Sequence, residues 1–279
     1  MLKDRKVFLI RAQGVDTLEL SSAHTQVNIF NGIARTTLSH TYKNVSPNAL
    51  ETQFSFPVNA DMAISRLLVV SDGVEYEAKI VDKKEADEKY NDAVAAGGSA
   101  FQLNYDSSKD NIVVMNIGSL GPEKELEVQM TVVQTMKVRF NQWYFSLASN
   151  FVPRVIDETE ELNLEFAGKQ QMAQVQEELK TTKDHEPYSL EVNIKASGEI
   201  TYFDVPSHEL IEEEKEGKTC SFKVDTSKGD DKNFEMFYNY EGYREPRVLI
   251  QRNLEYPDQA ALMLNFFPDF DGDDLSTAN

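Results

Sequence analysis

The chain has 279 residues, enough for one large domain or two of ordinary size. Apolar residues make up 41 % of it and aromatic residues 10 %, so a core can be filled and a disordered chain is excluded. The formal net charge is −19, and residues 155–279, with 29 acidic and 12 basic side chains, account for −17 of it. This balance argues against nucleic-acid binding, which depends on clustered Lys and Arg.

Apolar periodicity in the first half predicts short strands separated by turns, the pattern of an all-β architecture. Asn31-Gly32 predicts a hairpin turn. Leu126, Val128, Met130 and Val132 alternate along one run and should share one face of a strand. The predicted strands are 6–10, 25–30, 33–42, 50–56, 63–70, 74–81, 111–117, 125–136 and 143–148.

One segment in this half predicts a helix instead, at about 82–96. Asp82 and Glu85 have the spacing of a capping box, and Gly97-Gly98 follows where a helix C-cap is expected. Its apolar stripe consists of Ala86, Tyr90, Ala93 and Val94, which we expect to cover an open sheet face. A phosphate-binding loop has its glycines before a helix, so this pattern rules one out.

The second half again predicts strands, at 161–166, 188–196, 199–205, 219–225, 233–240, 247–253 and 260–267. Between the first two, residues 170–180 favour a short helix over a polar loop. We therefore expect two domains: residues 1–150, and a second antiparallel β-sandwich-like domain over 151–268. Residues 269–279 have no periodicity and predict an acidic linker.

A set of short motifs in the first half resembles the VIT (vault protein inter-alpha-trypsin) domain over about residues 15–150. The motifs are GIARTTLSHTYKN (32–44), FSFPVNADMAI (54–64), KKEADEKYNDAVAAGGSAFQL (83–103) and VMNIGSLGPEKELEVQM (114–130). The residues matching the family pattern are Tyr42, Asn44, Phe56, Pro57, Glu85, Ala86, Tyr90, Ala93, Gly97, Ala100, Gly118, Leu120 and Pro122. The pattern often has Tyr where Val133 stands, and Leu-Leu where this chain has Phe101-Gln102-Leu103.

The resemblance implies a β-sandwich with one inserted helix, followed by the segment that precedes a von Willebrand factor A domain in relatives. EPRVLIQRN (245–253) and AALMLNFFPDF (260–270) resemble that segment. The metal-binding Asp-x-Ser-x-Ser loop that opens such an A domain does not occur in this sequence. The chain is thus similar to the N-terminal part of a VIT and A-domain protein.

The sequence gives little indication of catalytic or metal-binding sites. The helix carboxylates Glu85, Glu88 and Asp92 predict a solvated face, and Glu212, Glu213, Glu214 and Glu216 a charged turn. Asp269, Asp271, Asp273 and Asp274 have the oxygen density of a calcium loop, but an EF-hand needs about 12 residues ending in Glu, so a solvated linker is favoured. The histidines His24, His40, His185 and His208 lie in different runs, without metal-ligand spacing.

Two further side-chain groups have alternative interpretations. Trp143, Tyr144 and Phe145 could form an exposed aromatic hot spot, but alternation places at least one of them in the core. Cys220 lies in a strand pattern that predicts a buried, inert thiol, and a single cysteine excludes an internal disulfide and a cysteine-based zinc site.

The sequence therefore predicts a protein that is not an enzyme, with no catalytic, cofactor-binding or metal-binding residues. Its function would be that of a scaffold or protein–protein interaction module beside an A domain. The alternative is an accessory region of a larger enzyme, such as a vault poly(ADP-ribose) polymerase. We expect protein partners, no nucleic acid and no membrane span, since no apolar run reaches the roughly 18–20 residues of a span. The polar N-terminus lacks a secretory signal and favours a cytoplasmic protein, or a secreted one if Met1 is not the native start.

Overall fold

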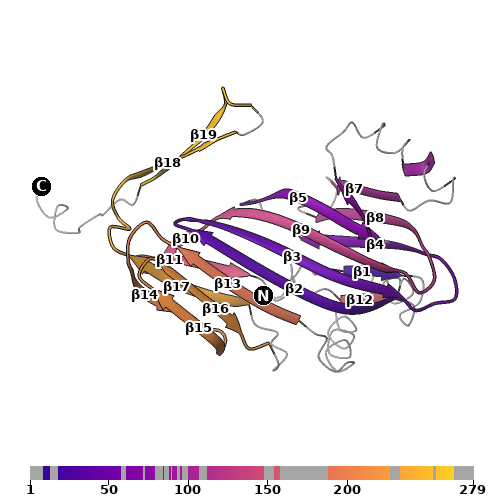
Figure 1. The fold of residues 1–279 in the computed structure, drawn as a ribbon, viewed down its shortest axis with the longest axis horizontal. Coiled ribbons are helices and arrows are strands. Elements are labelled where there is room, and N and C mark those ends of the chain that lie inside the picture. The colour runs from indigo at the N-terminus through magenta and orange to yellow at the C-terminus, as the bar shows by residue number, and fades with distance from the viewer. Residues whose placement is uncertain are drawn as a thin grey trace, which may run out of the picture.

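A computed structural model shows four β-sheets in the residues that it describes (Figure 1). The mainly-β prediction is confirmed. The described residues are 9–12, 18–57, 61–71, 73–78, 84, 88, 90–92, 95, 100–106, 112–147, 154–157, 188–226, 233–253 and 256–266.

The longest sheet has eight strands in the order β15-β16-β13-β2-β3-β9-β5-β6. Its pairs are antiparallel except for β13 and β2, which run parallel. The bounds are β15 (Leu210–Glu216), β16 (Thr219–Val224), β13 (Tyr188–Lys195), β2 (Leu18–Phe30), β3 (Ile33–Asn44), β9 (Glu125–Thr135), β5 (Met62–Ser71) and β6 (Val74–Glu77).

Three smaller sheets complete the fold. A five-stranded sheet has the order β12 (Arg154–Asp157), β1 (Leu9–Ala12), β4 (Leu50–Pro57), β8 (Ile112–Leu120) and β7 (Ala100–Asp106). A four-stranded sheet has the order β10 (Lys137–Arg139), β11 (Gln142–Leu147), β17 (Phe234–Tyr240) and β14 (Ile200–Asp204). A two-stranded sheet consists of β18 (Arg247–Arg252) and β19 (Ala260–Asn265).

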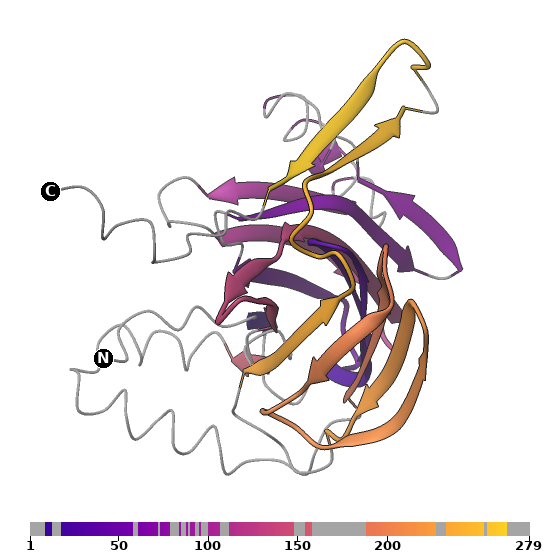
Figure 2. The same cartoon turned by 90° about the vertical axis from the view of Figure 1, so that its left-hand side faces the viewer.

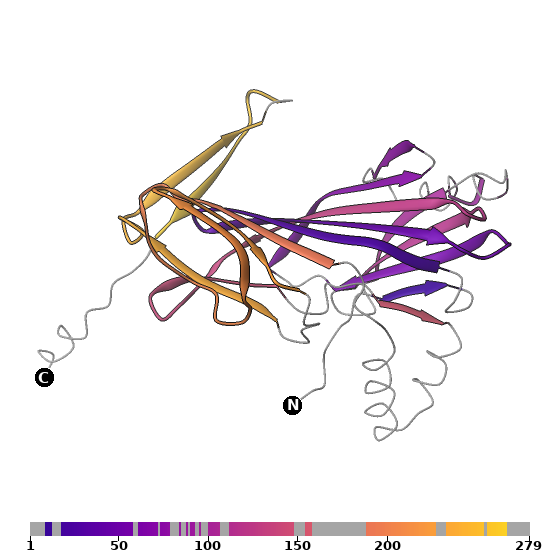
Figure 3. The ribbon, with the colours of Figure 1, turned by 60° about the horizontal axis from the view of Figure 1, so that its bottom comes forward.

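The eight-stranded sheet serves two sandwiches at once, because β2 and β3 are long enough to extend from one into the other (Figure 3). In the first sandwich it packs on the five-stranded sheet, with the rings of Tyr42 and Phe54 in edge contact at 5.1 Å between centroids. In the second it packs on the four-stranded sheet, where the Phe222 and Phe234 centroids lie 6.3 Å apart. The predicted alternation of β9 is confirmed, since its four predicted apolar residues are all buried.

The predicted domain boundary near residue 150 does not coincide with a break in the sheets. Strands β10 and β11 precede it, yet β11 pairs with β17 of the second sandwich. Strand β12 follows it, yet pairs in parallel with β1 of the first. One continuous cluster of buried apolar residues runs through both sandwiches. The division at 150 stays a prediction about folding units.

The Asn31-Gly32 turn is confirmed, and it is buried. Asn31 has a positive φ of 50°, as a tight hairpin turn requires, and Tyr238 donates its hydroxyl to the Asn31 carbonyl oxygen. The Asn31 amide donates to Ser197 Oγ (2.8 Å), and the Ser197 backbone N–H donates to Asn31 Oδ1 (2.9 Å). The turn that joins β2 to β3 is thereby built into the interior of the second sandwich.

The predicted helix lies largely outside the described residues. Its described positions, Lys84, Glu88, 90–92 and Ala95, are helical, and Lys84 Nζ lies 3.9 Å from Glu88 Oε1 at i,i+4 spacing. Tyr90 is half-buried, and burial together with the charge of Glu51 raises its pKa. The rest of its apolar stripe, the predicted strand 161–166, the helix at 170–180 and the linker 269–279 lie outside the described residues.

Candidate protein-interaction surface

The expectation that at least one of Trp143, Tyr144 and Phe145 lies in the core is confirmed: all three side chains are buried, so they form no exposed aromatic hot spot. Trp143 and Phe145 point into the second sandwich, and Tyr144 points to the opposite face of the same sheet. There Tyr144 stacks under the Arg139 guanidinium (4.0 Å to the ring centroid) and donates its hydroxyl to Glu235 Oε1 (2.6 Å). These contacts occupy both the ring face and the hydroxyl, so Tyr144 is a packing residue.

The predicted charged turn at 212–216 is wrong, because these glutamates form strand β15. Glutamate disfavours strands, but here the hairpin to β16 overrides that preference. Gly217 makes the hairpin turn with a positive φ of 53°. All four glutamate side chains are exposed, so the predicted solvation itself is confirmed.

The structure keeps the described histidines apart. His24 Nδ1 on β2 lies 2.6 Å from Ser189 Oγ, and His208 Nδ1 between β14 and β15 lies 2.8 Å from Ser207 Oγ, while His185 lies outside the described residues. His40 is buried in β3, and burial lowers its pKa to about 3, so its imidazole is neutral at pH 7. Within the described ranges, no group of three or more His, Cys, Asp or Glu is placed to hold a metal ion.

The remaining candidate residues of the sequence analysis are Cys220 and the helix carboxylates. Cys220 is buried as predicted, and burial raises the pKa of its thiol to about 11, which leaves little thiolate for reaction. Glu88 and Asp92 are exposed, and Glu85 lies outside the described residues. The absence of catalytic and metal-binding residues stays a prediction.

Several exposed apolar residues lie together on the hairpin β18–β19, which projects from the end of the second sandwich (Figures 1 and 2). In its register Val248 faces Leu264 and Ile250 faces Leu262, so these four side chains share one face of the hairpin. Their exposed fractions lie between 53 % and 68 %. Phe266, directly after β19, is 66 % exposed. We call the four residues of this face the apolar hairpin face.

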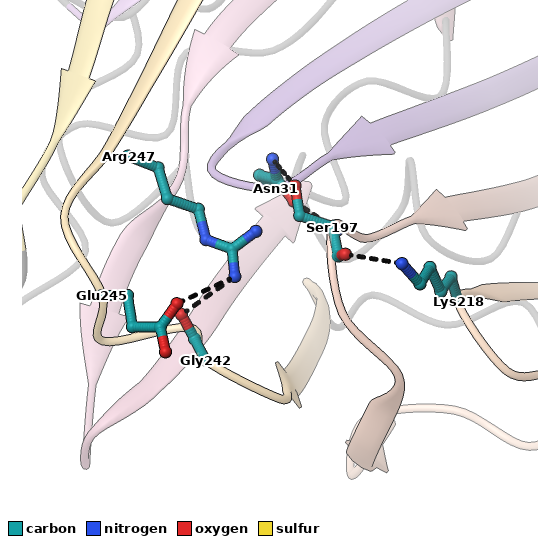
Figure 4. Close-up of polar contacts among 6 residues, drawn as sticks. All are labelled: Asn31, Ser197, Lys218, Gly242, Glu245 and Arg247. Carbon is teal, nitrogen blue, oxygen red and sulfur yellow. Dashed lines mark hydrogen bonds and ion pairs between the residues drawn. The ribbon is translucent and has the colours of Figure 1, made fainter.

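The hairpin is anchored at its base. Arg247 Nη2 lies 3.5 Å from Glu245 Oε2 and donates to the Gly242 carbonyl oxygen at 3.4 Å (Figure 4). The same guanidinium lies over the Tyr240 ring, 5.5 Å from its centroid. Gly242 makes the turn after β17 with a positive φ of 70°, where a Cβ would lie 2.9 Å from the Arg247 side chain. The base is therefore fixed to the core while the two strands extend outward.

Another exposed apolar residue, outside the apolar hairpin face, lies at the tip of the β10–β11 hairpin. Phe140 is 87 % exposed and has a positive φ of 52°, a conformation that is strained for a bulky side chain. Its ring lies 6.5 Å from that of Phe237, and the next residue, Asn141, accepts a hydrogen bond from the Tyr243 hydroxyl (2.9 Å) at the base of the β18–β19 hairpin.

The sequence predicted the strands at 247–253 and 260–267 but not their exposure. Both runs were assigned to a sandwich because apolar alternation normally marks a buried face. One signal was present in the composition: both strands carry apolar residues on both faces, whereas a strand with one solvated face is apolar on the other face alone. Exposure depends on where the hairpin leaves the fold, which local periodicity does not encode.

Comparison with known proteins agrees with the motifs in the first sandwich. Residues 20–132 match the family model of the vault protein inter-alpha-trypsin (VIT) domain. The chain carries a VIT domain. The predicted resemblance over about residues 15–150 is thereby confirmed.

Relatives of this VIT protein extend well beyond it. Human protein mono-ADP-ribosyltransferase PARP4 is 22 % identical over 254 residues, which cover 91 % of this chain and 14 % of that protein. Human von Willebrand factor A domain-containing protein 5A is 31 % identical over 121 residues, or 43 % of this chain and 15 % of the relative. A von Willebrand factor A domain-containing protein of Dictyostelium discoideum is 25 % identical over 218 residues, or 77 % and 21 %. The chain thus spans between 14 % and 21 % of their lengths.

Among solved structures, an M1 zinc metallopeptidase from Deinococcus radiodurans aligns at 5 % identity, covering 89 % of this chain and 47 % of that one. The TM-score is 0.37, too low to support an argument about fold or function. In the part of the chain that the structure describes, no helix has the length and apolarity to cross a membrane.

The VIT motif residues have a structural role in the first sandwich. Asn44 is fully buried at the end of β3, and its amide donates to the carbonyl oxygens of Asn48 (2.8 Å), Leu120 (2.8 Å) and Gly121 (3.0 Å). Its Oδ1 accepts the Ser46 backbone N–H at 2.9 Å. One side chain thus joins the turn after β3 to the end of β8, which explains why the motif needs an amide there.

Proposed function

We propose that this VIT protein is a non-catalytic protein-interaction module, and that it contacts its partner through the apolar hairpin face. The observation that carries the proposal is the projecting position of four large aliphatic side chains, each more than half exposed. A contiguous exposed apolar patch on a soluble domain commonly marks an interaction site. The relatives contain von Willebrand factor A domains, so a following A domain and a cytoplasmic scaffold role belong to the same proposal.

A second candidate function is that of an accessory region in a larger enzyme. The alignment with PARP4 supports it, because it runs through both sandwiches rather than the VIT domain by itself. The two candidates differ in what the gene encodes after Asn279. An Asp-x-Ser-x-Ser strand loop there would favour the scaffold, and a polymerase domain would favour the accessory region.

The interaction proposal is tested by capture with matched variants. Ile250→Asp with Leu264→Asp places two charges on the apolar hairpin face, and Ile211→Asp serves as the control. Ile211 is 64 % exposed on β15 and Ile250 is 65 % exposed on β18, so the two sites differ in position but not in residue type or exposure. We expect partner capture from a cell extract, quantified by mass spectrometry, to be lost in the hairpin variant and kept in the control. Equal capture by both would contradict the proposal.

A further inference from the structure

The exposed edges of the sheets differ in charge. Natural proteins protect edge strands with charged side chains, because an unprotected edge accepts another strand. Edge strand β15 carries four glutamates, β10 carries Lys137 and Arg139, and β6 carries Glu75 and Glu77. Strand β18 carries Arg247 and Arg252 at its two ends. Strand β19 has no charged residue, and the sequence is uncharged from Gln259 through Phe267.

The hydrogen-bond pattern shows which backbone groups of β19 are available. The Asn253 N–H donates to the Gln259 carbonyl oxygen at 3.0 Å, so this pair is a hydrogen-bonded one. Such pairs alternate with non-hydrogen-bonded pairs in an antiparallel ladder, whose N–H groups point away from the partner strand. The register then places the N–H groups of Ala260, Leu262 and Leu264 on the outer edge of β19. None of the described strands pairs with that edge.

The surroundings of β19 restrict the chemistry of an added strand. The chain has a formal net charge of −19, Asp258 lies in the exposed turn just before β19, and the sequence continues with Asp269 and Asp271 soon after it. A second copy carries the same net charge of −19 and would be repelled. A segment with Lys or Arg at its ends would instead be attracted by this net charge, and one of its ends would lie near Asp258.

We propose that β19 binds an extended segment of another protein, which adds as a third strand, is apolar on alternate residues and is flanked by basic residues. The inference rests on the proposed function and specifies the partner of the same surface. The added strand would take main-chain hydrogen bonds from the outer N–H groups of β19 and place its apolar residues beside Leu262 and Leu264. A third strand would also stabilise the hairpin, since an isolated two-stranded sheet is marginal in water.

The test uses synthetic peptides and the whole chain. The probe is acetyl-KKTVTVTVTKK-amide, and the matched control replaces its four lysines with glutamates. We expect the basic peptide to bind, as measured by calorimetry at low salt, and the acidic one to bind at least about tenfold more weakly. Binding of the basic peptide should also weaken as salt is added. Equal affinity for the two peptides overturns the proposal.

A backbone variant tests the strand-addition geometry. Ala260→Pro removes one outer N–H and no large side chain, at the first position of the strand, where proline is tolerated. We expect about tenfold weaker peptide binding, with Ala260→Thr, which keeps the N–H, close to wild type. Hydrogen exchange on the wild type gives a second measure: the peptide should slow exchange at Leu262 and Leu264, whose N–H groups lie on the outer edge of β19. Unchanged exchange at both leucines contradicts the proposal.

The outcomes separate this inference from the proposed function. If neither peptide binds while hairpin-dependent capture persists, the partner chemistry is wrong and the interaction module stands. If capture does not depend on the hairpin, both are wrong. If the chain dimerises in sedimentation velocity and Ala260→Pro abolishes the dimer, a second copy is the occupant and the inference is overturned.

Discussion

Two hairpins of this protein have opposite environments. The β2–β3 hairpin lies at the centre of the eight-stranded sheet, and its turn at Asn31 is buried against Ser197 and Tyr238. The β18–β19 hairpin has no third strand among the described residues and exposes its aliphatic side chains. Both have the apolar alternation of ordinary strands. The difference indicates that burial here is decided by position in the topology, and it separates residues that hold the fold together from residues free to bind.

The largest expected effect comes from truncating the core beneath the buried turn. Tyr238 is fully buried and bonds to the Asn31 carbonyl oxygen, so Tyr238→Ala should lower the free energy of unfolding by about 3–5 kcal/mol. Leu264→Ala on the exposed hairpin should change it by less than about 0.5 kcal/mol. Urea denaturation of the two variants measures both. A similar loss in the two would remove the distinction between the hairpins.

This contrast also marks what the sequence could predict. Local alternation identified β9 and β17, because buried and exposed residues alternate along each. The Asn-Gly pair identified the β2–β3 turn. Strand β15 was missed because its glutamates contradict strand propensity, and only its pairing with β16 makes it a strand.

The pairing of strands that are distant in the sequence could not be predicted from local patterns. The parallel alignment of β13 with β2 joins residues more than 160 positions apart, for example Val192 with Val27. No local pattern encodes such a pair, so the sharing of one sheet by two sandwiches could not be predicted from the sequence. The exposure of the described β18–β19 hairpin has the same origin, because it depends on where the hairpin lies in the topology.

The next effect concerns the polar contacts of the buried turn. Asn31→Ala removes both side-chain bonds to Ser197, leaves a partly buried backbone N–H without its acceptor, and replaces the residue type best suited to positive φ. We expect a loss of about 2–3 kcal/mol in the free energy of unfolding, measured by thermal and urea denaturation. Asn28→Ala is the control, since Asn28 is exposed on the neighbouring strand β2 and its amide donates to Gln26 Oε1 at 3.3 Å. An equal effect in the control would show that the turn contacts contribute little.

A pH dependence should arise from the buried part of the same hairpin. The pKa of His40 is lowered from 6.5 to about 3 in the folded protein, so the unfolded chain binds the extra proton between those pH values. The stability from the neutral imidazole is complete above pH 6.5 and is lost as pH falls toward 3, at about 1.4 kcal/mol per pH unit within that range. We expect wild type to lose about 2 kcal/mol more than His40→Leu between pH 7.5 and pH 5. Parallel stability curves for the two proteins would exclude this role, and His24→Gln, at a more exposed histidine, should follow wild type.

The smallest expected effect on stability comes from substitutions on the exposed β18–β19 hairpin. Leu262→Thr and Ile250→Thr keep β-branched or strand-compatible side chains on β18–β19 while removing apolar surface that is already more than half exposed. Little burial is lost, so the free energy of unfolding should stay within about 0.5 kcal/mol of wild type. Binding of an environment-sensitive dye such as ANS should nevertheless fall, because the apolar hairpin face is the dye's expected site. Phe140→Thr at the strained β10–β11 tip tests whether that site contributes separately: dye binding that falls with Phe140→Thr but not with the hairpin variants would move the interaction surface from β18–β19 to the tip of β10–β11.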